Sequence, residues 1–254
     1  MPRCELTIVI PCYNERDTIL EIISRVKRLP IDKEILIVDN CSTDSTRELL
    51  IGACTLGDGA HGRAPARGFQ PTMAGQEILS GDGFVVVLQP SNMTKGTSVK
   101  TGIALASGRW VICQDADLEY DPEDILKLLE HAERTGAVAV FGSRLAQHNG
   151  EVRRDAFHVG RVALTQFFNV LYQSRLTDVA TCYKLMRTDV ARELGLTSSG
   201  FDLDFEIPAK LRRKRYSIED VPVSYHPRTQ DQGKKIRWRD GLTAAWTMTK
   251  ARFG

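Results

Sequence analysis

The sequence predicts an α/β fold in which a mostly parallel sheet is covered by helices on both faces. Two observations carry this prediction: short apolar runs rich in β-branched residues recur along the first half of the chain, and helical patterns alternate with them. Parallel strands are buried on both faces and need a crossover between them, which a helix usually supplies. The composition, 42% hydrophobic and 26% charged, is that of an ordinary globular protein.

The five expected strands lie at residues 5–11, 34–39, 84–89, 109–115 and 137–143. The helix after the second strand opens with "STDSTRELL", whose first residues are typical of a helix cap. A later helix is predicted to have Asp121 as its cap and Pro122 at its first position. Apolar residues at helical spacing define the other helices: Ile19, Ile22, Ile23, Val26 and Leu29; Val99, Ile103 and Leu105; Ile125, Leu128, Leu129 and Ala132.

The second half of the chain is less regular. We expect a helix at 157–172, a strand within "YSIEDVPVSY" and a final helix from Asp240. Residues 52–83 are rich in glycine and lack apolar periodicity, so they are predicted to form a loop insertion. No linker or repeat separates the rest, and a single domain over residues 1–254 is expected.

Charge is distributed unevenly. The net charge is +2, yet residues 207–254 hold twelve Lys and Arg against four Asp and Glu. This excess predicts an anionic partner, such as phosphate groups, an acidic membrane surface or nucleic acid. The six cysteines show no metal-site spacing, and neither a signal peptide nor a spanning apolar run is evident, so a cytoplasmic location is expected.

Polar residues follow the predicted strands, where ligands of an open parallel sheet bind. A tyrosine among carboxylates suits a nucleoside, and Lys95 suits a phosphate. Helix capping alone is the simpler explanation for some of these residues, but it leaves Asp115 and Asp117 unexplained. The residues in question are Pro11, Tyr13, Asn14, Glu15, Asp39, Asn40, Asn92, Lys95, Asp115 and Asp117.

The stretch "VICQDADLEYDPEDI" crowds carboxylates behind an apolar run. In an extended chain Asp115, Asp117 and Glu119 would project to one side. Like charges repel unless a cation joins them, and carboxylate oxygens suit Mg²⁺ or Mn²⁺ that bridges to a substrate diphosphate. The stretch therefore predicts a metal site for a nucleotide diphosphate.

The motifs "VIPCYNER", "EILIVDNCSTDST", "QDADLEYDP", "FGSR", "TCYKLMR" and "YHPRTQDQGKKIRWRDG" resemble, in order and spacing, the inverting family-two glycosyltransferases. The polyprenyl-phosphate sugar transferases, such as the dolichol-phosphate mannose synthases, are the most similar members. The sequence departs from their pattern at Asn40, where an acidic residue is frequent, at Thr94, where glycine is usual, and at Glu119, where the mannose synthases tend to have glutamine.

The resemblance implies a GT-A, Rossmann-like fold with a nucleotide-sugar-binding half at 1–145 and a less regular acceptor and membrane-facing half at 146–254. It implies transfer from a GDP-mannose or UDP-glucose type of donor to a dolichyl or undecaprenyl phosphate, with Mg²⁺ or Mn²⁺ bound. The implied metal ligands are Asp115, Asp117 and Glu119. The implied donor-binding residues are Pro11, Tyr13, Asn14, Glu15, Asp39, Lys95, Asp115 and Ala116. The implied catalytic residues are Asp117, Glu206, Arg144 and Arg228, and Arg228, Lys234 and Lys235 are expected to hold the acceptor phosphate.

Three alternatives stay open. A family-two enzyme acting on a sugar or protein hydroxyl would need a general base, for which Glu206 is the candidate. A nucleotidyltransferase would need a glycine-rich loop after the first strand, which "PCYNERDT" lacks. A noncatalytic module that binds nucleotides or nucleic acid leaves the "DAD" carboxylates without a role.

With a polyprenyl phosphate as acceptor, the protein is expected on the cytoplasmic face of an anionic membrane, docked by its own surface or by a small membrane-anchoring partner. A nucleic-acid partner is not expected. The sequence does not tell the donor sugar, its base or the oligomeric state.

Overall fold

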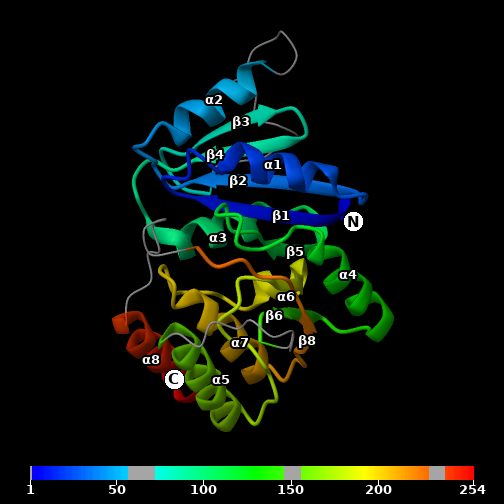
Figure 1. The fold of residues 1–254 in the computed structure, drawn as a ribbon, viewed down its shortest axis with the longest axis vertical. Coiled ribbons are helices and arrows are strands. Elements are labelled where there is room, and N and C mark those ends of the chain that lie inside the picture. Colours follow the sequence, from blue (N-terminus) through cyan, green and yellow to red (C-terminus); the bar gives the residue numbers. More distant parts are fainter. Residues whose placement is uncertain (1, 57–71, 146–155, 229–237) are drawn as a thin grey trace. The chain divides into compact units, whose positions relative to one another are not determined.

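The structure is a computed structural model that describes residues 2–56, 72–145, 156–228 and 238–254 (Figure 1). The chain forms two compact units. The first unit contains Met1–Leu118 and Arg187–Arg192, and the second contains Glu119–Met186 and Glu193–Gly254. Each unit is described by itself below.

The first unit contains the strands β1 (Cys4–Cys12), β2 (Lys33–Asp39), β3 (Glu77–Gly81), β4 (Phe84–Leu88) and β5 (Gly108–Cys113), in the order β3-β4-β2-β1-β5. All neighbours pair in parallel except β3, which runs antiparallel to β4 at the edge. Cys12 lies opposite Asp39, and Asp39 lies opposite Leu88. The carboxyl ends of three parallel strands are therefore level, and the loops that follow them start together.

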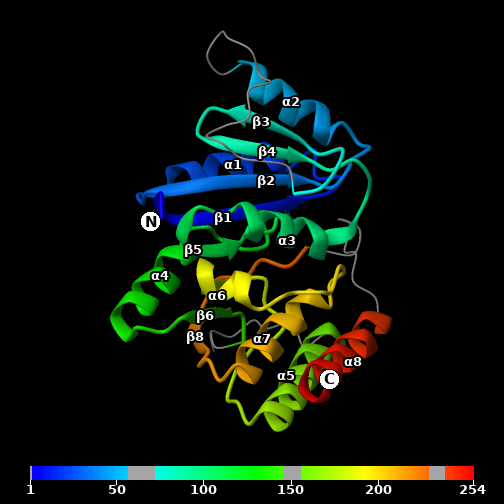
Figure 2. The ribbon, with the colours of Figure 1, turned by 180° about the vertical axis from the view of Figure 1, so that it is seen from behind.

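Helices cover both faces of this sheet. The helix α1 (Ile19–Arg28) lies in front of the sheet in Figure 1, and α3 (Thr94–Leu105) lies in front of it in the opposite view of Figure 2. The helix α2 (Thr46–Leu56) contacts β3 and β4. A Cβ atom at Gly102 would lie only 2.2 Å from a Val9 methyl carbon, so glycine allows α3 to approach β1 closely.

The first unit also takes in a segment from far along the chain. The helix α6 (Thr188–Glu193) belongs to it except for its last residue. The Arg192 guanidinium donates to the carbonyl oxygens of Ile103 and Ala104 at 3.2 and 3.0 Å, and to that of Ala106. This arginine therefore caps the C-terminus of α3, whose last carbonyl groups have no partner within the helix.

The second unit contains α4 (Asp124–Thr135), β6 (Ala139–Ser143), α5 (Ala156–Tyr172), β7 (Lys184–Arg187), α7 (Leu203–Arg213), β8 (Glu219–Pro222) and α8 (Trp238–Phe253). The strand β6 pairs antiparallel with β7 and parallel with β8. The helices α5 and α8 lie side by side in both views (Figures 1 and 2), and the Tyr172 hydroxyl donates to the Met248 carbonyl oxygen at 2.7 Å. Within the described residues, no helix is both long and apolar enough to span a bilayer.

The predicted α/β class and the mostly parallel sheet are confirmed. The predicted cap is displaced, because α4 begins at Asp124 with Glu123 at its N-cap; Asp121 instead accepts the backbone N–H of Glu123 on its Oδ1 at 3.1 Å, in the turn before the helix. The loop predicted over 52–83 is partly wrong, since α2 continues to Leu56 and β3 forms at Glu77–Gly81. Residues 57–71 lie outside the described part. The predicted division at residue 145 falls inside the second unit.

Candidate functional site

The loops after β1 and β2 are held together by side chains of both. Asn14, at φ 55°, donates its backbone N–H to the Ser42 hydroxyl at 3.0 Å, and its Oδ1 accepts the Thr43 N–H at 2.8 Å. The Glu15 N–H donates to the Thr46 hydroxyl at 3.0 Å. Both residues were predicted to bind the donor. In the structure, Asn14 fixes the two loops to each other at the carboxyl edge of the sheet.

Asp39 ends β2 and is fully buried. Its Oδ2 accepts a hydrogen bond from Arg47 Nε at 2.6 Å, and its Oδ1 accepts the Ser42 N–H at 3.2 Å. Arg47 in turn donates to the Gln89 carbonyl oxygen at 2.5 Å, beyond the end of β4. The predicted direct contact of Asp39 with a nucleoside has no support in this arrangement, because the carboxylate has no exposed surface. Asp39 instead sets the position of Arg47.

The loop before α3 is attached to the end of β2 through Asn40. Its Nδ2 donates to Asn92 Oδ1 at 2.9 Å, and its Oδ1 accepts the Met93 N–H at 2.8 Å. Thr94 then adopts a φ of 68°, which is unusual for a β-branched residue. This left-handed residue turns the chain into α3 and is followed directly by Lys95.

Lys95 and Asp115 meet within the first unit. The Lys95 ammonium lies 2.6 Å from Asp115 Oδ1, and the two side chains are 20% and 19% exposed. Asp115 lies two residues after the end of β5, while Lys95 lies in the first turn of α3. Two residues predicted separately for the diphosphate and for the metal are therefore in contact, and they are accessible.

The expected extended conformation of the acidic stretch is wrong. Residues 116–118 form a turn, and Leu118 has a φ of 62°. Asp115, Asp117 and Glu119 therefore do not alternate as they would in a strand. Glu119 belongs to the second unit, whereas the two aspartates belong to the first.

Left-handed residues other than glycine concentrate in these loops. Among the described residues, five of the seven with positive φ follow the strands β1, β2, β4 and β5: Asn14, Cys41, Ser45, Thr94 and Leu118. Such conformations cost free energy and persist where surrounding contacts enforce them, which is typical of ligand sites. The strain supports a binding site at the carboxyl edge of this sheet.

Glu119 is fixed inside the second unit. Its Oε2 accepts the Tyr225 hydroxyl at 2.7 Å, and its Oε1 accepts the Arg228 N–H at 2.8 Å. Its carbonyl oxygen accepts the His226 N–H at 2.8 Å. Burial and the neighbouring Glu119 charge raise the pKa of Tyr225, so this tyrosine stays a neutral donor. The carboxylate predicted as a third metal ligand thus orders the segment 225–228.

Tyr120 continues this attachment. It stacks on Tyr183 with ring centroids 4.5 Å apart, and its hydroxyl accepts the Cys182 N–H at 3.2 Å. The Tyr183 hydroxyl donates to the Asp121 carbonyl oxygen at 3.0 Å. The "EYD" residues are therefore fixed to the "TCY" segment.

Arg144 was predicted to hold a phosphate, but its main partner is Asp178. Arg144 Nε and one terminal nitrogen donate to the two carboxylate oxygens of Asp178 at 2.6 and 2.8 Å, and the side chains are 9% and 0% exposed. Burial alone would raise the pKa of Asp178, but the Arg144 charge and hydrogen bonds outweigh it and hold that pKa below its ordinary value. One edge of the Arg144 guanidinium is thus occupied.

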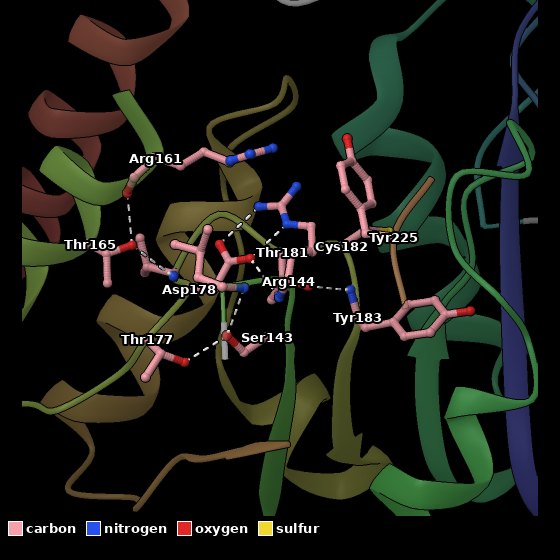
Figure 3. Close-up of polar contacts among 12 residues, drawn as sticks. Ser143, Arg144, Arg161, Thr165, Thr177, Asp178, Thr181, Cys182, Tyr183 and Tyr225 are labelled. Atoms are coloured by element: carbon pink, nitrogen blue, oxygen red, sulfur yellow. Dashed lines mark hydrogen bonds and ion pairs between the residues drawn. The ribbon is translucent and has the colours of Figure 1, made fainter. Parts of the chain in front are cut away.

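A second arginine, Arg161 of α5, lies beside this pair and was missed in the sequence. The guanidinium carbons of Arg144 and Arg161 lie 5.2 and 5.7 Å from the Tyr225 ring centroid. Figure 3 shows the two guanidinium groups next to each other, between Asp178 and Tyr225. Arg161 Nε is buried and has no hydrogen-bond acceptor among the described residues. No motif surrounds Arg161 in the sequence, so only the fold could reveal it.

Glu206 does not act where it was predicted to. The side chain is buried, and it accepts the Thr197 N–H at 3.0 Å, the Ser198 N–H at 2.8 Å and the Thr197 hydroxyl at 2.7 Å. The Lys210 ammonium lies 2.7 Å away. Burial would raise the pKa of Glu206, but these donors, Lys210 foremost, lower it to about 2. The role as a general base is therefore corrected: Glu206 attaches the preceding loop to α7.

The other predicted residues are distributed as follows. Pro11 and Ala116 are buried, and Tyr13 is half-buried in the loop after β1. Arg228 is half-buried, and its backbone is attached to Glu119. Lys234 and Lys235 lie outside the described residues.

Comparison with known proteins assigns this arrangement to a family. Residues 7–195 match the family model of glycosyl transferase family 2. The chain belongs to this family. The match covers the first unit from Thr7 onward and a little over half of the second unit, and it includes Asp115, Asp117, Arg144 and Arg161.

Among curated family-2 relatives, the hexosyltransferase Agl6 of Haloferax volcanii is 25% identical over 88% of this chain and 48% of its own length. The dolichol-phosphate mannosyltransferase of Pyrococcus furiosus is 26% identical over 91% of this chain and 59% of its own. The glycosyltransferase AglJ of H. volcanii is 26% identical over 87% and 63%. The chain thus spans about half to three-fifths of the length of these relatives.

Two solved structures show the same fold. Glucosyl-3-phosphoglycerate synthase of Mycobacterium tuberculosis, in complex with Mn²⁺, UDP and phosphoglyceric acid, has a TM-score of 0.65 at 17% identity and covers 99% of this chain and 79% of its own. The mannosyltransferase PcManGT of Pyrobaculum calidifontis, in complex with GDP-mannose and Mn²⁺, has a TM-score of 0.56 at 19% identity over 87% and 57%. The GT-A-like α/β fold expected from the resemblance is confirmed.

Thr94 gives a stability test of the loop that carries Lys95. We expect Thr94→Gly to raise the free energy of unfolding by about 0.5–1 kcal/mol, because glycine accepts a φ of 68° without the Cβ strain. Thr97→Gly, in the same helix at ordinary φ, should lower it by roughly half a kcal/mol. Urea unfolding of both variants measures the two values. If both variants lose the same free energy of unfolding, Thr94 is not strained in the wild type.

Glu206 gives a second test. Because its folded pKa of about 2 lies below the ordinary 4.5, its contribution is present above pH 4.5 and is lost as the pH falls toward 2. Glu206→Gln should therefore lower the free energy of unfolding by about 2–3 kcal/mol at neutral pH, and by less in acid. Glu193, whose carboxylate lies 2.7 Å from Lys214 on the surface, is the matched control. Glu193→Gln should change stability by less than about 0.5 kcal/mol, and a pH-independent Glu206→Gln effect would refute the prediction.

Proposed function

We propose that this family-2 chain is a metal-dependent, inverting glycosyltransferase that moves a sugar from a nucleotide diphosphate donor to a polyprenyl phosphate. The observation that carries the proposal is the contact of Lys95 with Asp115 at the strained carboxyl edge of the first sheet. Ligands of open α/β sheets bind at this edge. The donor is of the GDP-mannose or UDP-glucose type, in keeping with the names of the relatives and the ligands bound to the similar structures.

The first unit supplies the groups for the donor. Tyr13 follows β1 in a loop fixed by Asn14, and it offers a ring on which a base can stack. Arg47, held by Asp39 and Gln89, is 23% exposed and adds a cation beyond the strand ends. Lys95 provides a point charge for a phosphate oxygen. Asp39 then acts through Arg47 instead of touching the nucleoside.

Asp115 and Asp117 fit a divalent cation. Both side chains are partly exposed, both offer hard oxygen ligands, and a cation, the Lys95 ammonium, already lies at Asp115. We propose that these two aspartates hold Mg²⁺ or Mn²⁺, which would supply charge neutralisation for the diphosphate leaving group. Glu119 is left out of this set, because its oxygens accept hydrogen bonds from Tyr225 and from the Arg228 backbone.

The second unit supplies cations for an anionic acceptor. The buried Nε of Arg161 has no acceptor within the part of the chain that the structure describes, and Arg144 is held beside it by Asp178. A phosphate oxygen would satisfy the donor and match the planar guanidinium. Arg161, with Arg144 as its support, therefore replaces Arg144 alone as the proposed phosphate ligand. The predicted contribution of Arg228, Lys234 and Lys235 stays part of the proposal.

The burial of Glu206 supports an acceptor that needs no general base. A hydroxyl acceptor needs a base to take its proton, and the proposed base, Glu206, is buried with a pKa of about 2. A phosphate oxygen is already anionic at neutral pH and needs no base, only positioning. The structure thus favours the phosphate acceptor over the sugar or protein hydroxyl that the sequence left open.

One screen tests the proposal. The protein is incubated with Mn²⁺, a panel of sugar nucleotides, and one of three acceptors: a polyprenyl phosphate, phosphoglyceric acid or a sugar. We expect one donor to be hydrolysed slowly without acceptor and consumed much faster with the polyprenyl phosphate. If sugar is transferred only to phosphoglyceric acid or only to the sugar, the proposed acceptor is wrong, while the proposed nucleotide diphosphate donor stands. Inertness toward every donor would overturn the proposed function.

A further inference from the structure

The second unit exposes a large apolar surface on α5 and α8. In the described part of the chain, seven of the nine large hydrophobic side chains that are exposed lie on these two helices. Single exposed apolar residues are normal, but several on two neighbouring helices indicate an interaction surface. The members of this α5–α8 face are Val159, Val162, Phe167, Val170, Leu242, Trp246 and Phe253.

Each helix presents these residues on one side. Leu242, Trp246 and Phe253 are spaced by four and seven residues, so they form one stripe along α8, and Trp246 is 67% exposed. The other side of α8 is packed, because Ala244 and Met248 are buried. On α5, Val159 and Val170 are 62% and 81% exposed, while Thr165 and Phe168 are buried. Two amphipathic helices thus turn apolar stripes to the outside.

Lysine and arginine outnumber the acidic residues around the face, where Asp202 accepts a hydrogen bond from the Thr247 hydroxyl at 3.4 Å. Lys250 and Arg252 are exposed in the last turns of α8, and Arg213 of α7 donates to the carbonyl oxygens of Ala251 and Gly254 at 3.4 and 3.3 Å. The sequence of α5 contains no acidic residue, and that of α8 contains only Asp240. Aromatic and aliphatic side chains among cations are typical of helices that lie in the interface of an anionic membrane.

We propose that the α5–α8 face docks on the surface of an anionic lipid bilayer. The choice of a lipid partner rests on the proposed function, since a polyprenyl phosphate is a membrane component. It also rests on charge: a two-fold dimer would bring Lys250 and Arg252 of both copies to one interface, where they repel, whereas anionic lipids attract them. Apolar burial then adds to the electrostatic attraction.

This assignment differs from a docking site in the basic run "KLRRKR" of α7. Lys210 and Lys214 of that run each have a glutamate 2.7 Å away, Glu206 and Glu193 respectively. Arg212 donates to the Tyr216 carbonyl oxygen at 3.1 Å. These charges are largely used within the protein, so the run is a weaker candidate than the exposed face.

Vesicle flotation tests the proposal. We expect the protein to float with vesicles of phosphatidylcholine and phosphatidylglycerol, much less with phosphatidylcholine alone, and to be released by salt. Trp246→Gln with Phe253→Ser should weaken binding to the mixed vesicles by at least roughly tenfold, because two large apolar side chains no longer enter the interface. The matched control is Leu20→Gln with Ile51→Gln, which changes the two exposed apolar residues of the first unit and should float as wild type.

Each other outcome overturns a defined part. If the wild type stays in solution with both kinds of vesicle, or if the Trp246 and Phe253 variant floats like wild type, the lipid surface is wrong. If that variant instead converts a dimer to a monomer, the face binds a second copy, and the proposal also fails. Hydrolysis of a soluble sugar nucleotide is measured in parallel. Flotation without transfer to a lipid phosphate would overturn the proposed acceptor and leave this inference in place.

Discussion

Asp117→Ala is expected to lower sugar transfer by at least roughly 10³-fold, to the point where no product is detected. Asp117 and Asp115 lie in the turn after β5, where we propose that they hold the cation that neutralises the diphosphate. Without one of these carboxylates, the cation would be held less tightly. The negative charge that develops on the diphosphate as its bond to the sugar breaks would then not be neutralised. The measurement is transfer at saturating donor, together with the rise in melting temperature that Mn²⁺ and donor produce in the wild type.

Stability separates loss of the metal from loss of the fold. Asp117→Ala should unfold at nearly the same urea concentration as wild type in the absence of Mn²⁺, because the side chain is partly exposed in a turn, where substitutions change stability little. Asp115→Asn should be equally inactive, although it also removes the charge that lies 2.6 Å from Lys95. Asp82→Ala, which breaks the exposed contact with Lys27 at 2.6 Å, is the matched control and should transfer sugar normally. An active Asp117→Ala enzyme would show that the metal is held elsewhere.

The fold of the first unit could be predicted because its signals are local. Each buried parallel strand is a continuous apolar run, as in "ELTIVIP" and "FVVVL", and its helix follows at once. The strand β3 was missed because glycine and polar residues surround a short edge strand whose pairing with β4 is antiparallel. The strand β7 and helix α6 were missed because only four and six residues form them.

The site residues could be predicted as a set, but their roles depend on partners that are distant in the sequence. Lys95 and Asp115 are twenty residues apart, and only the loop geometry brings them into contact. Glu206 was predicted to be a catalytic residue, but in the folded chain its carboxylate is occupied by contacts with Thr197, Ser198 and Lys210. Arg144 was predicted to bind a phosphate, but one edge of its guanidinium is occupied by Asp178, which is 34 positions later in the sequence.

Arg161 could not be predicted for two reasons: no sequence motif marks it, and its neighbours in the structure are distant in the sequence. It lies in a helix without a recognisable motif, and its neighbour Tyr225 is 64 positions away in the sequence. Among the described residues, its buried Nε has no acceptor, and the burial of a single nitrogen can be seen only in the folded chain. Such a group is costly to leave unsatisfied, which is why we propose a ligand there.

Arg161→Met is expected to reduce transfer to a polyprenyl phosphate by roughly 10²-fold and to leave donor hydrolysis unchanged. Methionine keeps the apolar part of the side chain against Tyr225 and removes the charge, so the second unit should stay folded. If Arg161 positions the acceptor phosphate, the loss should appear mainly as a higher KM for the acceptor. Arg161→Lys should recover part of the activity, since it restores the charge without the planar fork.

Arg109 provides the matched control for this last prediction. Its guanidinium carbon lies 5.7 Å from the Trp110 ring centroid, the same distance as that from Arg161 to Tyr225, but the side chain is 54% exposed in the first unit. Arg109→Met removes an arginine above an aromatic ring without touching the proposed acceptor site, so its transfer kinetics should match the wild type. If Arg161→Met loses donor hydrolysis together with transfer, the arginine serves the donor or the fold. If it transfers sugar as well as Arg109→Met does, the acceptor phosphate binds elsewhere, and the buried Nε of Arg161 meets some other acceptor.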